Sequence, residues 1–230
     1  MDDATRQRAW DAAGAAAAAL VEDGMQVGLG TGRAAAAGVR ALARRVTDEG
    51  LSVTTVATSL QTEALARELG LTLAPLSRAC EIAFDGADVV TPTGLVIKGA
   101  GGALVRERVV DDTAGRFIVL VDEPKVASHP SSWGTLPVAV LPFAADYVAA
   151  QLADLAPTRR PDHSDDNLVV LDLRPPQGAA WHPIMARVRA LPGVVDAGLF
   201  DVATEDVFVG EPDGTCRTLA ELIAEGHTFG

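Results

Sequence analysis

The first half of the chain alternates short apolar runs with helix-favouring segments, and this alternation restricts its fold more than any other feature. The apolar runs predict strands at 25–30, 51–58, 82–86, 94–99 and 116–123. Between them, helical spacing or composition predicts helices at 3–21, 34–46, 59–70 and 101–110. We therefore expect an open, mainly parallel sheet with helices on both faces, an α/β domain of the Rossmann-like type.

A change in composition at residues 129–137 marks a second unit. Extended and helical segments then follow in the order strand, helix, strand, helix, strand, with the last strand at 197–203. This order is typical of a small α+β domain of the ferredoxin-like type. The strand and turn at 206–215 are expected to return to the first sheet. We predict a Rossmann-like α/β domain built from residues 1–130 and 205–230, and a small α+β domain from residues 131–204.

The charge of the chain limits its partners. With 19 Lys and Arg against 31 Asp and Glu, the formal net charge of −12 argues against a nucleic-acid or anionic-membrane partner. The Ala-rich run at 12–21 follows the acidic Asp2 and Asp3, and no apolar span reaches the length of a membrane helix. We expect a cytoplasmic protein whose anionic ligand, if any, lies in a local cationic pocket.

The sequence offers no metal-ligand pattern. Cys80 and Cys216 lie far apart without a CxxC spacing or a neighbouring His, which argues against both a zinc site and a disulfide framework. The four histidines are scattered along the chain at positions 129, 163, 182 and 227. We expect neither a metal ion nor a cofactor.

A glycine-rich turn follows the first predicted strand. In VGLGTGR, Gly30 and Gly32 allow backbone N–H groups to approach an oxyanion, and Thr31 adds a hydroxyl. The same residues also fit a tight turn that needs glycine for backbone reasons. The turn is not a dinucleotide-binding fingerprint, because Ala35 stands where the third glycine is required.

A second polar turn follows the second predicted strand. Thr58 and Ser59 place hydroxyls at the start of a helix, next to the same end of the predicted sheet. Serine and threonine at such positions most often only cap the helix. Both interpretations remain open from the sequence.

The stretch DGADVVTPTGLVIKGAGGALVRERVV carries the strongest chemical signal. Asp85 and Asp88 end a strand and are expected to crowd one crevice, each raising the proton affinity of the other. Lys98 follows an apolar run, which places an ammonium at another strand end. Glu107 lies in a helix between two arginines, and taken alone it fits a charge on a solvated face. The combination of an acid pair, a lysine and a glutamate around glycine-rich turns favours a functional site.

This stretch resembles the DGADE, IKGGGGAL and REK motifs of the type A ribose-5-phosphate isomerases. The likeness continues in both directions, from Val27 to Gly214. It includes the segments VGLGTG, TSLQTEALARELG, FIVLVDEPK, LPVAVLPFA and LPGVVDAGLF.

The resemblance implies a metal-free aldose–ketose isomerase of the pentose phosphate pathway, a homodimer or homotetramer that interconverts ribose 5-phosphate and ribulose 5-phosphate. By resemblance, Glu107 is the base that moves a proton between C2 and C1, and Lys98 stabilises the enediolate. Asp85 and Asp88 would bind hydroxyls, assist ring opening and hold the lysine. The residues expected to bind the sugar phosphate are Gly30, Thr31, Gly32, Arg33, Thr58, Ser59, Gly99, Gly101 and Lys125.

The chain departs from the family pattern at the phosphate end. Arg33 and Ala34 replace the Ser-Thr pair of the family's GTGST loop, and Val89 replaces a glutamate. A family lysine near the N-terminus has no clear match. Arg33 is a candidate for a replacement phosphate contact. Two alternatives stay open: a divergent isomerase of another sugar or sugar phosphate, and a non-catalytic sugar-phosphate sensor, against which the complete acid and lysine set counts.

Overall fold

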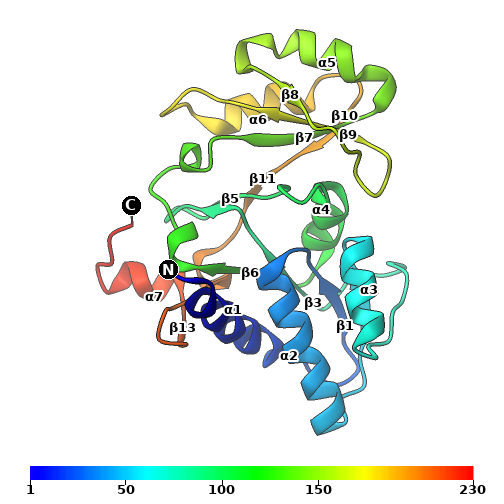
Figure 1. The fold of residues 1–230 in the computed structure, drawn as a ribbon, viewed down its shortest axis with the longest axis vertical. Coiled ribbons are helices and arrows are strands. Elements are labelled where there is room, and N and C mark those ends of the chain that lie inside the picture. The colour runs from blue at the N-terminus through cyan, green and yellow to red at the C-terminus, as the bar shows by residue number, and fades with distance from the viewer. Residues whose placement is uncertain (230) are drawn as a thin grey trace.

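The computed structural model describes residues 1–229 and places a six-stranded sheet in the larger of two lobes (Figure 1). Five neighbouring strands are parallel, and only the edge strand β13 runs antiparallel to its neighbour. The predicted return of the C-terminal strand to this sheet is confirmed, because β12 pairs with β6. The order across the sheet is β13 (Cys216–Thr218), β12 (Val207–Gly210), β6 (Phe117–Asp122), β3 (Ile82–Gly86), β1 (Gln26–Leu29) and β2 (Thr54–Ala57).

Helices cover both faces of this sheet, as the sequence predicts. The helices α1 (Asp3–Ala18) and α2 (Arg33–Glu49) pack together over one face. They approach closely because Gly14 has no side chain: a Cβ there would lie 2.5 Å from the backbone nitrogen of Gly38. The opposite face is covered by α4 (Leu104–Thr113) and α7 (Leu219–Ala224), while α3 (Leu60–Glu68) follows β2.

The smaller lobe has the ferredoxin-like order that the sequence predicts, with one additional strand. Its antiparallel sheet runs β10 (Val194–Ala197), β7 (Leu136–Val140), β9 (Val169–Leu173) and β8 (Thr158–Arg159). Residues of α5 (Ala145–Gln151) and α6 (Trp181–Arg189) enclose the core of this lobe. Strand β8 is only two residues long, so it carries no period-2 pattern that sequence analysis can detect.

Helix α4 lies between the two sheets (Figure 1). Its Val110 packs against Ala83 of the large sheet. At its first turn, Leu104 packs against Ala139 and Val170 of the smaller sheet. One helix is therefore held by the hydrophobic cores of both lobes, which fixes the direction of its polar side chains.

A third, three-stranded sheet joins the lobes, and it corrects the strand predicted at 197–203. The chain leaves the smaller sheet at the end of β10 and enters β11 (Leu199–Asp201), which pairs with β5 (Leu95–Ile97) and so joins β4 (Val89–Val90). Gly198 makes the change of sheet possible, because a Cβ there would lie 2.1 Å from the carbonyl oxygen of Lys98. The predicted boundaries at 130/131 and 204/205 remain a prediction.

The helix predicted from residue 101 begins later, at Leu104. Residues 99–103 form a turn in which Gly99 and Gly102 have φ values of 103° and 80°. Side chains other than hydrogen disfavour this region, so the glycines delay the helix. Five 3₁₀ helices complete the described chain: Glu123–Lys125, Pro130–Ser132, Pro142–Ala144, Ala153–Leu155 and Thr204–Asp206. Across residues 1–229 the structure contains no helix with the length and apolar character needed to cross a membrane.

Candidate active site

A cleft of about 640 Å³ opens where the carboxyl ends of β1 and β3 meet the turn before α4. This is the edge at which open α/β sheets bind ligands. Most residues predicted from the sequence line it, and they come from segments far apart in the chain. They are Thr31, Gly32, Arg33, Asp88, Lys98, Gly99, Gly101, Glu107 and Lys125.

Lys98 is the centre of the site. It follows β5, its side chain is only 1% exposed, and its Nζ lies 2.7 Å from Oδ2 of Asp85. The ammonium also donates to the carbonyl oxygen of Gly86 at 2.7 Å, and Oε2 of Glu107 lies 3.6 Å away. Burial opposes the charge on Lys98, but the surrounding carboxylates outweigh this effect and raise its pKa above the ordinary value. The lysine is therefore a permanent cation.

Asp85 lies beneath the cleft and holds two parts of the site together. Its Oδ1 accepts hydrogen bonds from the backbone N–H groups of Thr31 at 2.8 Å and Gly86 at 2.6 Å. A Cβ at Gly30 would lie 2.1 Å from this same oxygen, so Gly30 is required by the packing of Asp85 and does not itself line the cleft. Asp85 thus contacts Lys98 directly, while its predicted role in the reaction stays a prediction.

Asp88 faces the cleft, unlike Asp85. Its Oδ2 accepts a hydrogen bond from the backbone N–H of Ala100 at 3.0 Å. Burial raises the pKa of both aspartates, and this is the main cause for each. Both pKa values are raised, as the sequence predicts, but the leading cause is burial, and the other aspartate is not among the main causes for either group.

Glu107 is buried, which rules out the solvated-face interpretation. It lies in the first turn of α4, is 4% exposed and points toward Lys98. Its neighbours Arg106 and Arg108 point elsewhere and pair with Asp166 and Asp196. Burial, opposed by the charge of Lys98, raises the pKa of Glu107 to about 8. A carboxyl group with a pKa in this range exchanges a proton readily near neutral pH.

Asp111 is a third carboxyl group beside Lys98, and it was not predicted from the sequence. Its Oδ2 lies 3.8 Å from the Nζ of Lys98, and neither carboxylate oxygen has a hydrogen-bond partner. Burial raises its pKa well above the ordinary value. The signal was present in the spacing, because Leu104, Glu107 and Asp111 lie three and four residues apart on one face of the helix.

Thr58 and Ser59 lie behind the cleft and support Thr31. The Thr31 hydroxyl lies 2.9 Å from that of Thr58 and 2.8 Å from that of Ser59. Thr58 also donates to the carbonyl oxygen of Leu29, and Ser59 caps α3 by accepting from the N–H of Thr62. Neither residue lines the cleft. Ser59 is the N-cap of α3, whereas the Thr58 hydroxyl bonds β1 and Thr31 and caps no helix.

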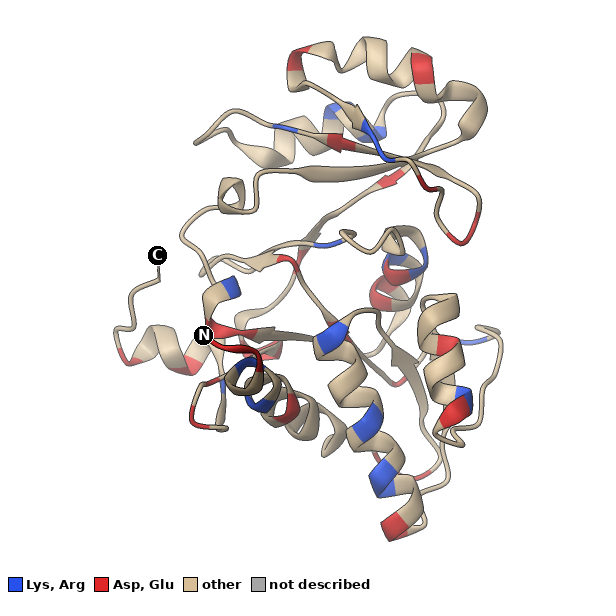
Figure 2. Ribbon diagram, viewed as in Figure 1, with Lys and Arg blue, Asp and Glu red and all other residues tan. Residues whose placement is uncertain are grey.

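Cationic side chains gather at one end of the cleft. Lys125 follows β6 and donates to the carbonyl oxygen of Ala87; burial lowers its pKa. Arg33 begins α2 and is exposed, and its guanidinium carbon lies 4.6 Å from the centre of the Trp10 ring. Arg40 lines the cleft about two turns further along α2. Figure 2 shows basic positions recurring along this helix up to the end that faces the smaller lobe.

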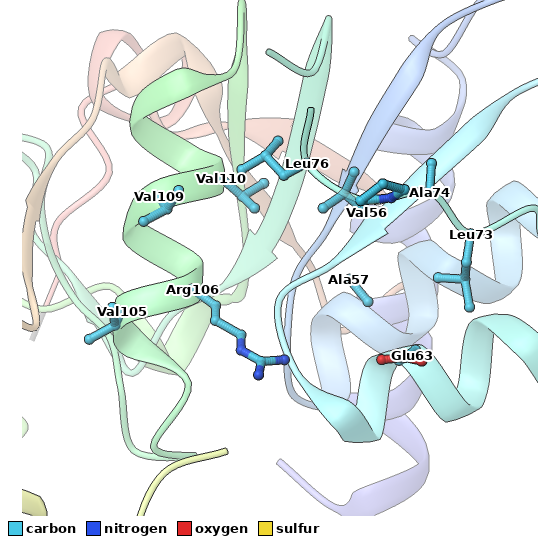
Figure 3. A pocket seen from close by; sticks show the side chains of 11 residues that line it. Val56, Ala57, Glu63, Leu73, Ala74, Leu76, Val105, Arg106, Val109 and Val110 are labelled. Carbon is cyan, nitrogen blue, oxygen red and sulfur yellow. The ribbon is translucent and has the colours of Figure 1, made fainter. Parts of the chain in front are cut away.

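A second hollow of about 520 Å³ lies on the other side of α4, against α3 (Figure 3). Its lining is mainly aliphatic, from side chains such as Val56, Leu73, Leu76 and Val109. Its charged lining residues are Glu63 and Arg106, and it contains no residue predicted for the site. Asp88, Lys98 and Glu107 all line the first cleft.

Within residues 1–229, no three His, Cys, Asp or Glu side chains are arranged to hold a metal ion. A buried carboxyl group beside a buried ammonium, at the strand ends of an open α/β sheet, is the arrangement of an acid–base enzyme. The cationic end of the cleft suits a small anionic substrate.

Comparison with known proteins defines the family. Residues 54–214 match the family model of ribose 5-phosphate isomerase A (phosphoriboisomerase A). Ribose-5-phosphate isomerase A of Natronomonas pharaonis is 42% identical over 212 residues, covering 88% of this chain and 92% of that protein. The chain belongs to the ribose 5-phosphate isomerase A family.

Solved structures agree with this assignment. The ribose 5-phosphate isomerase A structure from Methanocaldococcus jannaschii superposes with a TM-score of 0.84 at 32% identity, covering 91% of this chain and 98% of that one. A D-ribose-5-phosphate isomerase in complex with phospho-erythronic acid gives a TM-score of 0.83 at 28% identity, covering 91% and 97%.

The pKa of Glu107 predicts the pH dependence of the reaction. A general base works only when it is deprotonated, so kcat/KM should rise with pH up to about 8 and then level off. Below that value we expect a loss of roughly tenfold per pH unit. Initial rates between about pH 6 and pH 9.5 measure this profile. A profile that is flat across this range would contradict the assignment of Glu107 as the base.

Proposed function

We propose that this chain interconverts D-ribose 5-phosphate and D-ribulose 5-phosphate through a cis-enediolate, with Glu107 as the base. The observation that carries the proposal is the pairing of Glu107 with Lys98 at 3.6 Å, both buried and both at the cleft. The family assignment supports the same reaction. The isomerisation requires removal of a proton from C2 of the open-chain aldose and its return to C1.

Glu107 performs both proton transfers. Its carboxylate takes the C2 proton to form the enediolate. The hydroxyl proton of O2 passes to O1, and the same carboxyl group then delivers its proton to C1 while O2 becomes the carbonyl oxygen. One carboxyl group can reach both carbons because they are adjacent, so the transfer from C2 to C1 needs no second acid. The pKa of about 8 makes the carboxylate more basic than an exposed glutamate and keeps it partly ionised near neutral pH.

Lys98 stabilises the negative charge that develops on O1 and O2. It remains protonated because three carboxyl groups surround it, and Asp85 fixes its direction. A fixed cation in a buried site requires little reorganisation when the charge appears, so the electrostatic stabilisation is large. Asp88 faces the same cleft and accepts hydrogen bonds from sugar hydroxyls, which assists ring opening.

The phosphate group of the substrate lies at the cationic end of the cleft. Lys125 and the backbone of Gly32 contribute there, and Arg33 replaces the hydroxyl donors that the family loop normally provides. Trp10 supports this role, because stacking on its ring holds the Arg33 guanidinium at the mouth of the cleft. The related enzyme bound to phospho-erythronic acid, a phosphorylated acid, is consistent with a phosphate at one end of the site.

A second candidate is an isomerase of another sugar or sugar phosphate. The observation that favours it is the altered loop, in which Arg33 and Ala34 change the donors offered to the ligand. A non-catalytic sensor is disfavoured, since a sensor does not need Glu107 held against Lys98. No metal ion takes part in the proposed chemistry.

The setting of the reaction is also a proposal. We place it in the cytoplasm and in the pentose phosphate pathway, and we infer that the active protein is a homo-oligomer, a dimer or tetramer. An exposed apolar patch on the smaller lobe supports self-association: Phe143 is fully exposed, and Leu141, Tyr147 and Val195 are about half exposed. These residues surround the junction of β7, α5 and β10, where the N–H of Leu141 donates to the carbonyl oxygen of Gly193.

Replacing the base tests the mechanism. Glu107→Gln is nearly isosteric but cannot accept the proton, so turnover should fall by about 10²–10⁴-fold with little change in KM. Steady-state rates with ribose 5-phosphate measure the effect, and Glu68→Gln, on the exposed face of α3, serves as the control. Turnover close to wild type in a folded Glu107→Gln protein would refute the mechanism.

Replacing Arg33 tests the phosphate site. Arg33→Ala should weaken binding of ribose 5-phosphate by about 1.5–3 kcal/mol, the range for a charged hydrogen bond, and leave binding of ribose almost unchanged. Isothermal titration with both ligands measures the difference. Arg44→Ala is the matched control, since Arg44 lies on the same helix, is exposed and does not line the cleft. Equal losses for both ligands would show that Arg33 does not bind the phosphate.

The apolar patch predicts the effect of a charged substitution on assembly. Phe143→Asp should shift the protein toward the monomer, because a carboxylate is costly in an apolar interface. Light scattering after size exclusion measures the mass, with Val109→Asp in the second hollow as the control. An unchanged mass in Phe143→Asp, or a monomeric wild-type protein, would contradict this use of the patch.

A further inference from the structure

Arg160 reaches from the smaller lobe to the turn that follows the catalytic lysine. It comes directly after β8, and its Nε and Nη2 donate to the two carboxylate oxygens of Asp172 at 2.8 and 2.7 Å. Its third nitrogen, Nη1, donates to the carbonyl oxygens of Gly99 at 2.8 Å and Ala100 at 2.9 Å. One guanidinium therefore joins a side chain of the smaller sheet to the backbone of the active site.

The turn that Arg160 contacts is part of the cleft. Residues 99–101 line it, and the N–H of Ala100 donates to the carboxylate of Asp88 at 3.0 Å. The peptide group on one side of Ala100 therefore orients Asp88, and the carbonyl oxygen on the other side is bound by Arg160. Gly99 has a φ of 103°, and glycine keeps the greatest backbone freedom of any residue. The turn has one internal hydrogen bond, from the N–H of Gly102 to the carbonyl oxygen of Gly99 at 3.0 Å, and Arg160 adds two contacts from outside it.

We propose that Arg160 is a positioning residue for the isomerase reaction: it holds the turn at residues 99–101 and, through the N–H of Ala100, fixes the orientation of Asp88. Arg160 does not line the cleft, so it acts without touching the substrate. This role rests on the proposed function in one respect, because it requires that Asp88 takes part in the isomerisation.

The chemistry of the side chain explains why an arginine is needed. A guanidinium is planar, and its N–H groups point in fixed directions within that plane. Binding of Asp172 by Nε and Nη2 therefore determines where the N–H groups of Nη1 point. Asp172 also balances the charge of Arg160. The pair adds no net charge, although the charge of Arg160 lowers the pKa of Asp88 against the larger effect of burial. A lysine has a single nitrogen and a flexible stem, and it cannot hold Asp172 and both carbonyl oxygens in this arrangement.

The simplest alternative is that Arg160 only fastens the two lobes together. A second ion pair provides a direct comparison, because Arg106 of α4 binds Asp166 of the smaller lobe in the same two-point manner, at 2.6 to 2.9 Å. That pair joins the lobes but contacts neither the 99–101 turn nor Asp88. A purely structural role predicts similar effects from breaking either pair.

The experiment compares Arg160→Lys and Asp172→Asn with the control Asp166→Asn. We expect Arg160→Lys and Asp172→Asn to lower kcat/KM by about 10- to 100-fold, the effect of a displacement near 1 Å at a reacting site. Asp166→Asn should keep kcat/KM within about twofold of wild type. Thermal unfolding identifies any variant that is not folded at the assay temperature. Equal kcat/KM losses in all three folded proteins, or full activity in Arg160→Lys, would overturn the proposal.

Two further measurements separate positioning from stability. Amide hydrogen exchange at Ala100 should become faster in Arg160→Lys, while exchange in the strands of the smaller sheet stays unchanged. In an Asp88→Asn background, Arg160→Lys should cost less in kcat/KM than it does in the wild type, because the two residues act through one hydrogen bond. Additive losses in that double variant, or unchanged exchange at Ala100, would count against the proposal.

The exchange measurement also keeps the proposal independent of the substrate. If the wild-type protein does not isomerise ribose 5-phosphate, the proposed function fails. Hydrogen exchange at Ala100 in Arg160→Lys still shows whether Arg160 holds the turn at residues 99–101. If the wild-type protein is active and Arg160→Lys matches it, only the role of Arg160 fails.

Discussion

The site depends on one buried charge, the ammonium of Lys98. An isolated cation in a protein interior is costly, and this one is stable because Asp85 lies 2.7 Å away and the carboxyl groups of Glu107 and Asp111 are near. The same contacts explain the reactivity of Glu107, since a carboxyl group that is buried and shares its cation with other acids holds its proton more tightly. The stability of the site and its reactivity therefore have the same origin, because three carboxyl groups share one cation.

The fold maintains that arrangement through α4. The helix is packed on both sides, by Val110 against the large sheet and by Leu104 against the smaller one, so the face that carries Glu107 has no freedom to turn. Lys98 is held just as firmly, because its backbone N–H donates to the carbonyl oxygen of Gly198 at 3.0 Å. The smaller lobe contributes no base or cation to the cleft, yet it holds the parts of the larger lobe that do.

Much of this could be predicted from the sequence, and the omissions have identifiable causes. The alternation of strands and helices predicted the α/β fold class. The acid and lysine motifs identified Lys98 and Glu107, because such residues rarely cluster around glycines without a function. Burial could not be predicted, which is why the solvated-face reading of Glu107 stayed open and Asp111 was missed. Contacts between the lobes could not be predicted either. Arg160 lies in a polar segment without helical or strand periodicity, and its partners are defined only by the folded structure. The strand predicted at 197–203 is interrupted at Gly198, where the chain passes from the smaller sheet to the three-stranded sheet. Such a change of pairing partner is a long-range effect that local periodicity cannot predict.

The order of strands in the large sheet carries a consequence for how the protein reaches its native state. Strand β6 pairs with β12, and the whole smaller lobe lies between them in the sequence. Contacts this distant must await closure of a long loop, which makes them slow to form. Lys98 has the same dependence, because its backbone partner Gly198 is among the later residues to be synthesised. During translation, the strand end that carries Lys98 therefore lacks its backbone partner until almost the whole of the second lobe has been synthesised.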